Sequence, residues 1–264
     1  MKYDFIIVGA GVAGLYAAMK IPPTKKVLII NKREPFKCNS FYAQGGIALA
    51  VDKDDIPSHI EDTLNAGAGL CDKDAVQVLS EASREIIDDF IARGFAFDSD
   101  KDGKLLYTKE AAHSKERILH AGGDATGRYM HYFLLTQNPH PMLTNARVVD
   151  LLIKNGVCYG VTVLDHRACR NIYADNIIIA SGGVGSLYEY HTNAPCISAD
   201  MQGLCAMKGI ELADMEMMQF HPTVFVDNHS AQKLLLTEAL RGEGATVEDE
   251  DGRRFLFDYD KRGE

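Results

Sequence analysis

The stretch Val8-Gly9-Ala10-Gly11-Val12-Ala13-Gly14, near the start of the chain, decides the fold. Residues 3–8 are largely apolar and end at a glycine, which predicts a short buried strand. A helical pattern then runs to Lys20, where two prolines end it, and residues 27–30 predict a second strand. A strand, a G-x-G-x-x-G turn, a helix and a strand in this order are typical of a dinucleotide-binding α/β unit.

Each glycine of the turn has its own physical role. Gly9 permits the tight turn, Gly11 lets a pyrophosphate approach the backbone, and Gly14 lets the helix pack closely on the strand. The helix N-terminus adds partial positive charge. About 20 positions further on, an acidic residue normally holds the ribose hydroxyls, but here Asn31 stands there, followed by Lys32. An amide lacks the charge of a carboxylate, so a plain NAD-dependent dehydrogenase is disfavoured.

Composition and charge limit the class of protein. The 264 residues are 46% hydrophobic and 25% charged, which is ordinary for one large globular domain or one and a half smaller ones. A net charge of −9 argues against nucleic-acid and membrane partners. Six scattered cysteines without a C-x-x-C pair fit a reduced protein better than a disulfide framework or a zinc site. The longest uncharged run, residues 5–19, is too short to span a bilayer. We therefore expect a soluble, cytoplasmic protein.

The rest of the chain alternates between helical and strand patterns. Helices are expected over 57–66, from an N-cap at Asp72 to a stop at Gly94, over 129–135 with Thr126 as the cap, and after Asp200. Alternating segments at 146–153, 157–165 and 170–174 predict a small added sheet. Residues 176–185 repeat the pattern of an apolar strand followed by glycines, which predicts a return to the dinucleotide sheet.

Four further motifs follow one another along the chain. They are the string Asn39-Ser-Phe-Tyr-Ala-Gln-Gly-Gly-Ile-Ala48, the stretch 113–128 with Arg117 and His120, the run 219–223 (Gln-Phe-His-Pro-Thr), and the run 236–244. Together they resemble the succinate dehydrogenase/fumarate reductase/L-aspartate oxidase flavoprotein family. The resemblance implies an α/β fold: a Rossmann-like FAD-binding domain with a small added β-sheet over residues 1–214. It also implies the start of an α+β capping domain over residues 215–264.

The same resemblance implies how FAD is bound. Members that carry covalent flavin have a histidine four residues before the alanine of A-Q-G-G, and here that residue is Asn39, so non-covalent FAD is expected. Val148 is expected beside the adenine and Asp200 on the approach to the isoalloxazine. The expected FAD-binding residues are Gly9, Ala10, Gly11, Val12, Ala13, Gly14, Asn31, Lys32, Asn39, Ser40, Phe41, Tyr42, Ala43, Gln44, Gly45, Gly46, Val148, Ser181, Gly182, Gly183 and Asp200.

The resemblance also implies a reaction. It is the oxidation of L-aspartate to iminoaspartate by hydride transfer to FAD, with O2 or fumarate as acceptor, in the first step of NAD biosynthesis from aspartate. Glu110, in the segment 108–114, is expected near the substrate amine, because an ammonium group requires a nearby anion. His221 and Thr237 are expected to hold a carboxylate, and Glu238 and Arg241 match a proton-relay pair of the reductases. Quinolinate synthase is the partner that this pathway implies.

Three alternatives remain open from the sequence. The chain fits a fumarate reductase or succinate dehydrogenase flavoprotein less well, because of Asn39 and the Glu110 segment. A non-catalytic FAD-binding module, or a scaffold without flavin, belongs to another class. The family's catalytic arginine and C-terminal elements lie beyond the motifs found here, so we expect the chain to be an inactive N-terminal portion of a protein about twice as long.

Overall fold

The computed structural model describes residues 2–166, 168–221, 223–227, 229–237, 239–242, 244–261 and 263. Its central element is a six-stranded sheet with the order β6-β2-β1-β9-β8-β7. The strands are β1 (Lys2–Val8), β2 (Val27–Ile30), β6 (Met142–Leu143), β7 (Ala146–Lys154), β8 (Val157–Asp165) and β9 (Ala168–Ile179).

The centre of this sheet is parallel and forms the dinucleotide-binding unit that the sequence predicts. Strand β1 pairs in parallel with β2 on one side and with β9 on the other. Val8 is in register with both Ile30 and Ile179, so the three strands end at one level. The loops that follow them therefore leave the sheet side by side, at the edge where open α/β sheets bind their ligands.

Strand β9 joins the parallel part to the antiparallel part. Its first half pairs antiparallel with β8, and its second half pairs with β1. The three alternating segments that the sequence predicts are all present as strands. They extend the main sheet itself, because β9 continues without a break into the stretch at 176–179.

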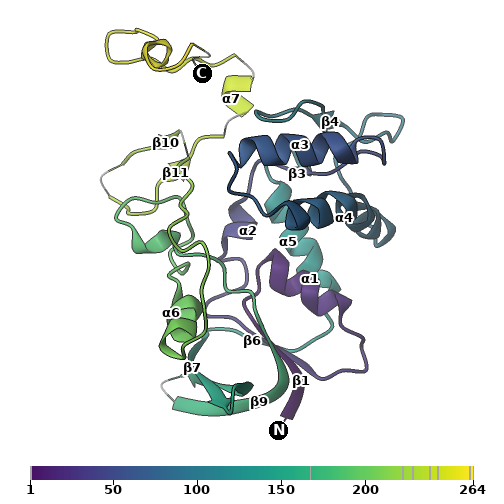
Figure 1. Ribbon diagram of the computed structural model, residues 1–264, viewed down its shortest axis with the longest axis vertical. Helices are drawn as coiled ribbons and strands as arrows, with labels where there is room; N and C mark the ends of the chain where they lie inside the picture. The colour runs from purple at the N-terminus through teal and green to yellow at the C-terminus, as the bar shows by residue number, and fades with distance from the viewer. Residues whose placement is uncertain are drawn as a thin grey trace.

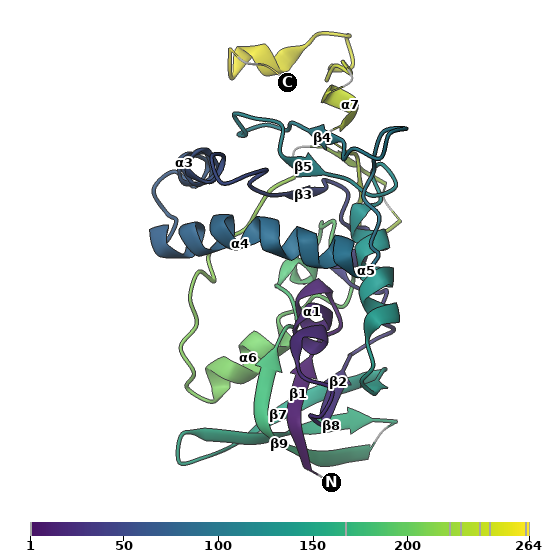
Figure 2. The ribbon, with the colours of Figure 1, turned by 90° about the vertical axis from the view of Figure 1, so that its right-hand side faces the viewer.

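Helices cover the two faces of the sheet (Figures 1 and 2). On one face, Ile7 packs with residues of α1 (Val12–Lys20), α4 (Lys73–Ala92) and α5 (Thr126–Gln137). On the other face, Ile6 and Val8 pack with α6 (Asp200–Met207) and with the inward residues of the antiparallel strands. Neighbouring residues of β1 thus belong to different cores, as the two-residue period of a strand requires.

A second layer lies beyond α4. It consists of α3 (Ile56–Ala66) and a three-stranded antiparallel sheet, β3 (Ile47–Ala48), β5 (Ile118–Leu119) and β4 (Tyr107–Thr108). The predicted N-cap of α4 is confirmed, because the Asp72 carboxylate accepts the Ala75 N–H at 2.9 Å. The cap predicted at Thr126 is wrong. Thr126 is already inside α5, and its hydroxyl accepts the Ala121 N–H at 3.1 Å.

The last part of the chain lies at the opposite end of the long axis from the N-terminus (Figure 1). It contains the short hairpin of β10 (Val224–Phe225) and β11 (Leu234–Leu235), then α7 (Ala239–Gly242). The short helix α2 (Asn39–Tyr42) lies at the end of α5 near the sheet edge. Within the described residues, no helix is long and apolar enough to cross a membrane.

Candidate functional site

The glycine turn after β1 is built so that a side chain would not fit. Gly9 has a φ of 114°, which residues with a Cβ rarely adopt, and a Cβ there would lie 2.2 Å from the Ala180 carbonyl oxygen. A Cβ at Gly14 would lie 2.1 Å from the Gly9 carbonyl oxygen. The turn therefore brings β1, α1 and the end of β9 into backbone contact.

A cavity of about 240 Å³ opens at this edge of the sheet. Its walls come from the glycine turn, the end of β2, the start of α2, the start of β7, the loop after β9 and the start of α6. The predicted cofactor residues that line it are Gly9, Ala10, Gly11, Val12, Ala13, Asn31, Lys32, Asn39, Ser40, Val148, Ser181, Gly182 and Asp200.

The other predicted cofactor residues lie outside this cavity. Gly14 packs α1 against the turn, and Gly183 lines a second cavity. The rest follow Ser40 along α2 and the turn beyond it, toward the small sheet: Phe41, Tyr42, Ala43, Gln44, Gly45 and Gly46.

Asn31 holds the glycine turn together. Its side-chain oxygen accepts the Ala10 N–H at 3.0 Å, and its amide group donates to the Arg33 carbonyl at 2.8 Å. Ser40 acts similarly, because its hydroxyl accepts the Val12 N–H in the first turn of α1 at 3.1 Å. Both side chains thus order the backbone of the turn, a structural role in addition to the FAD contact predicted for them.

Asp200 joins three elements at the far side of the cavity. Its carboxylate accepts from Lys32 at 2.9 Å and from Ser198 at 3.0 Å, and it pairs with Arg147 at 2.9 Å. Burial raises the pKa of Asp200, but these donors outweigh burial and hold it below its usual value. Asp200 and Val148 line the same cavity, whereas His221 lines a second cavity, which is described below.

Sequence reasoning missed several residues that line the first cavity. Arg33, Lys37 and Arg147 bring positive charge to it, and Cys38 and Cys196 add thiols. The one available signal was position, because Arg147 directly precedes Val148 and Cys38 directly precedes Asn39.

The second cavity, of about 480 Å³, begins next to the first. Gly182 lines the first and Gly183 the second, which also contains Gln202, Gln219 and His221. The Nδ1 atom of His221 lies 2.8 Å from the Thr223 carbonyl oxygen. The Thr223 backbone nitrogen also lies 3.3 Å from Nδ1, so both backbone groups of Thr223 hold the same ring nitrogen.

The remaining predicted substrate residues, at 237, 238 and 241, come after the residues of this cavity in the sequence. Leu235 of β11 lines it, and Thr237 follows two residues later, partly buried. Arg241 is partly buried in α7. Glu238 lies outside the described residues.

Glu110 lies at the turn that follows α2. A Cβ on Gly45 would lie 3.7 Å from both Glu110 carboxylate oxygens. At the neighbouring Gly46 a Cβ would come within 2.9 Å of the His120 ring, so the segment 108–120 packs directly on this turn. The fold thus brings the predicted amine-binding acid against the predicted flavin segment.

The family follows from a comparison with known proteins. Residues 4–264 match the family described as "FAD binding domain". The chain belongs to this family. It is therefore a FAD-binding flavoprotein, with the mixed α/β fold of the succinate dehydrogenase and fumarate reductase flavoproteins.

Two curated relatives and one solved structure show what this flavoprotein is similar to. It is 39% identical to the L-aspartate oxidase of Bacillus subtilis, over 100% of this chain and 50% of the relative. It is 39% identical to the L-aspartate oxidase of Nostoc sp., over 100% of this chain and 46% of the relative. Its structure matches E. coli quinol fumarate reductase with a TM-score of 0.89 and 30% identity, over 98% of this chain and 45% of that one. The chain spans about half the length of the curated relatives it matches.

The residues of the flavoprotein fit FAD. The side-chain oxygens of Gln44 and Gln202 are buried and have no hydrogen-bond partner among the described residues. Buried acceptors of this kind normally have a donor, and a flavin carries ring N–H and ribityl O–H donors. At Gly11, Ser40 Oγ is the one atom of the described residues that a Cβ would approach within 4 Å, so the turn is open toward the cavity. The open turn fits the pyrophosphate contact that the sequence predicts for residues 9–13, and the two unpaired oxygens fit donors of the rest of the cofactor.

Proposed function

We propose that this flavoprotein contributes the FAD site and part of the substrate site of an enzyme that oxidises L-aspartate to iminoaspartate, with O2 or fumarate as electron acceptor. The observation that carries the proposal is the position of the Glu110 carboxylate against Gly45, in the segment next to Gln44. The likeness to L-aspartate oxidases over the whole chain supports the same reaction.

Glu110 distinguishes the two related substrates by charge. L-Aspartate differs from succinate by an ammonium group, and a carboxylate beside that group forms a charge-assisted hydrogen bond. The chemistry that bound FAD supplies is acceptance of a hydride from the substrate Cα. The protein's task is to orient that carbon and to neutralise the charges around it.

His221 is proposed to hold one substrate carboxylate. Thr223 holds the imidazole ring in place through Nδ1, and a ring N–H of histidine is a donor suited to a carboxylate. The hydroxyl of Thr237 is a second proposed donor to the same group. Glu238 and Arg241 are proposed to balance the charge of the site.

The pathway context is part of the proposal. Iminoaspartate is unstable in water, which supports transfer to a second enzyme, proposed to be quinolinate synthase in NAD biosynthesis from aspartate. The six cysteines are all free thiols, which supports a reducing compartment such as the cytoplasm.

The test compares two substrates and one variant in the FAD-loaded protein. In the FAD-loaded enzyme that contains this chain, L-aspartate is expected to bleach the flavin absorbance under anaerobic conditions, and succinate to do so far more slowly. Glu110→Gln is expected to raise the dissociation constant for L-aspartate about tenfold or more and to leave that for succinate nearly unchanged, because a hydrogen bond to a charged group contributes about 1.5–3 kcal/mol. An equal loss for both substrates would reject the role of Glu110.

A second candidate is favoured by the fold comparison with fumarate reductase. Reaction with succinate or fumarate, and none with L-aspartate, would select it. A protein that retains FAD and reacts with neither substrate would instead be a binding module.

A further inference from the structure

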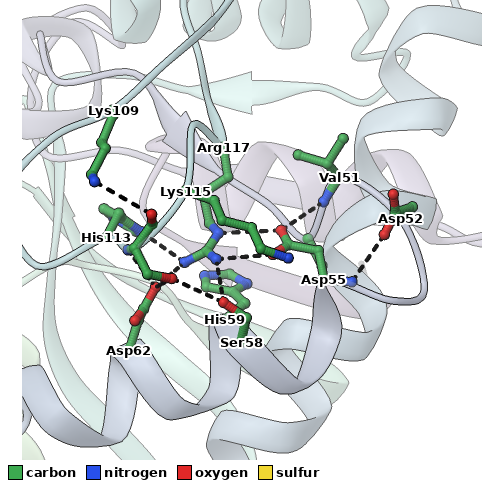
Figure 3. A network of polar contacts seen from close by, with 12 residues as sticks. Val51, Asp52, Asp55, Ser58, His59, Asp62, Lys109, His113, Lys115 and Arg117 are labelled. Atoms are coloured by element: carbon green, nitrogen blue, oxygen red, sulfur yellow. Dashed lines mark hydrogen bonds and ion pairs between the residues drawn. The ribbon is translucent and has the colours of Figure 1, made fainter.

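A buried arginine joins α3 to the segment that carries Glu110. The Arg117 side chain is fully buried, and its guanidinium donates to both oxygens of Asp55, at 2.9 and 3.2 Å. Another nitrogen of the same guanidinium group donates to Asp62, which lies further along α3. Figure 3 shows Asp55, at the N-cap of α3, and Asp62, within α3, both reaching Arg117. A buried charge needs such partners, so this ion pair fixes the segment against α3.

The carboxylates of Asp55 and Asp62 accept hydrogen bonds from different groups. Asp55 accepts from Arg117 and from the Val51 N–H of its own turn, and it pairs with Lys115 at 3.2 Å. Asp62 accepts three donors that all come from the segment 109–117. Besides Arg117, they are the Ser114 N–H at 2.7 Å and the Ser114 hydroxyl at 2.8 Å. Asp62 is therefore the carboxylate that holds the turn next to Glu110.

The turn from Glu110 to Ser114 needs an external hold. Ala112, at its centre, has a φ of 67°, the left-handed region that residues with a Cβ enter at a cost. Inside the turn, the His113 N–H donates to the Glu110 carbonyl at 3.3 Å, a long hydrogen bond. The short hydrogen bonds are those at the Ser114 end, two to Asp62 and one between the Ser114 and Ser58 hydroxyls at 2.9 Å. Contacts with α3 thus offset the strain at Ala112.

Glu110, at the other end of this turn, carries the carboxylate that is proposed to bind the substrate ammonium group. The Glu110 carboxylate lies next to Gly45, and Asp62 fixes the turn four residues later at Ser114. We propose that Asp62 is a positioning residue, which holds Glu110 in place for the substrate ammonium group through Ser114 and the turn 110–114. The inference rests on the proposed oxidation of L-aspartate, and it adds the residue that sets the preference for the amine.

The experiment measures the turn and the substrate preference separately. Asp62→Ala is expected to speed hydrogen exchange of the amides of residues 110–114, because it removes both bonds to Ser114. In the FAD-loaded protein it is expected to raise the dissociation constant for L-aspartate about tenfold, while that for succinate changes less than about twofold. Asp62→Asn keeps an acceptor for Ser114 and is expected to restore most of the preference.

A matched control lies on the neighbouring helix. Asp89 of α4 is also a carboxylate with two cationic partners, Lys20 and Arg93, and it does not contact the turn. Asp89→Ala is expected to leave both the exchange of residues 110–114 and the ratio of the two dissociation constants unchanged. If Asp62→Ala weakens both ligands equally, or leaves exchange of the turn at the rate of the unaltered protein, the positioning role is overturned.

Ser114→Ala carries the test if Asp62→Ala does not fold. It removes the hydroxyl that bonds both Asp62 and Ser58, and it leaves the Ser114 N–H bond and the ion pair of Asp62 with Arg117 in place. A loss of preference for L-aspartate of about threefold is expected, and an unchanged preference would overturn the proposal.

The Glu110→Gln variant, titrated with the same two ligands, separates a failure of the positioning role from a failure of the proposed amine contact. If it abolishes a preference that Asp62→Ala leaves intact, the positioning role fails and the proposed function stands. If the unaltered protein and Glu110→Gln both bind the two ligands equally, the proposed amine contact fails, and the positioning role toward it falls for that reason.

Discussion

At the scale of single residues, Gly11 and Gly14 differ in what a side chain would meet. A Cβ at Gly11 would point toward the cavity, with Ser40 Oγ 3.1 Å away. A Cβ at Gly14 would lie 2.1 Å from a backbone oxygen of the same turn. The first glycine therefore keeps space for a ligand, and the second keeps space for the fold.

Gly11→Val is expected to abolish FAD binding in a chain that still folds, because the added methyl groups occupy the space of the pyrophosphate. Flavin absorbance after gel filtration measures this directly. The matched control is Gly203→Val, at an exposed site of α6 where a Cβ meets no atom within 4 Å. A Gly11→Val protein that kept its full flavin content would contradict the assignment.

Gly14→Ala is expected to act on stability instead. The new methyl group has no room against the Gly9 carbonyl oxygen, and overpacking of this kind costs about 1–3 kcal/mol. Urea unfolding of the variant and of the unaltered protein gives the difference. An unchanged midpoint would show that α1 can move away from β1 without cost.

At the scale of elements, the contact of α3 with the segment 109–117 depends on pH. Burial raises the pKa of Asp62, but the Ser114 N–H and the Arg117 guanidinium outweigh it and lower the pKa from 3.8 to about 2. A carboxyl group whose pKa is lower in the folded state contributes its full stabilisation above the unfolded value. That contribution is lost as the pH falls from about 4 to about 2.

Asp62→Asn is therefore expected to cost about 2 kcal/mol of unfolding free energy at pH 7, since a shift of one pKa unit corresponds to about 1.4 kcal/mol. Urea unfolding at several pH values measures the gap between the variant and the unaltered protein. The gap is expected to be constant from pH 7 to pH 5 and to shrink below pH 4. A gap of constant size at low pH would assign the cost to packing.

The sequence patterns predicted an element correctly where the interactions that form it lie within a few residues of one another. The Asp72 cap and the glycine turn act within a few residues, and both are confirmed. Thr126 has the same capping chemistry, but its hydroxyl bonds Ala121, and the choice between the two depends on the path of the preceding loop. Arg117 belongs to a motif that the sequence shows, yet its burial depends on Asp55, 62 positions earlier.

At the scale of the whole molecule, the cavity gathers residues from six places in the chain. The glycine turn was predictable from spacing, because its chemistry is contiguous. Val148 and Asp200 could be placed only through the family resemblance, since nothing near them in the sequence points to a ligand. Arg147 was missed because its partner, Asp200, lies on a helix that reaches it only in the folded chain.

Whether the flavin is bound covalently also depends on the residues that meet at Asn39 in the folded chain. Asn39 donates to the Asn193 side chain at 2.6 Å and accepts the Ala194 N–H at 2.9 Å, so it ties α2 to the loop after β9. An amide nitrogen is a poor nucleophile, which supports non-covalent FAD. Acid precipitation of the protein is expected to leave all flavin in the supernatant. Flavin fluorescence that stays with the denatured chain on a gel would contradict this.

The position of β1 between β2 and β9 has a consequence for biosynthesis. The partner strand β9 ends at Ile179, so β1 leaves the ribosome long before one of its two neighbours exists. At roughly 5–20 residues per second, the delay is on the order of 10–30 s. Throughout that time Ile6, Ile7 and Val8 present an open, apolar strand edge. The six-stranded sheet can therefore close only after β9 has emerged.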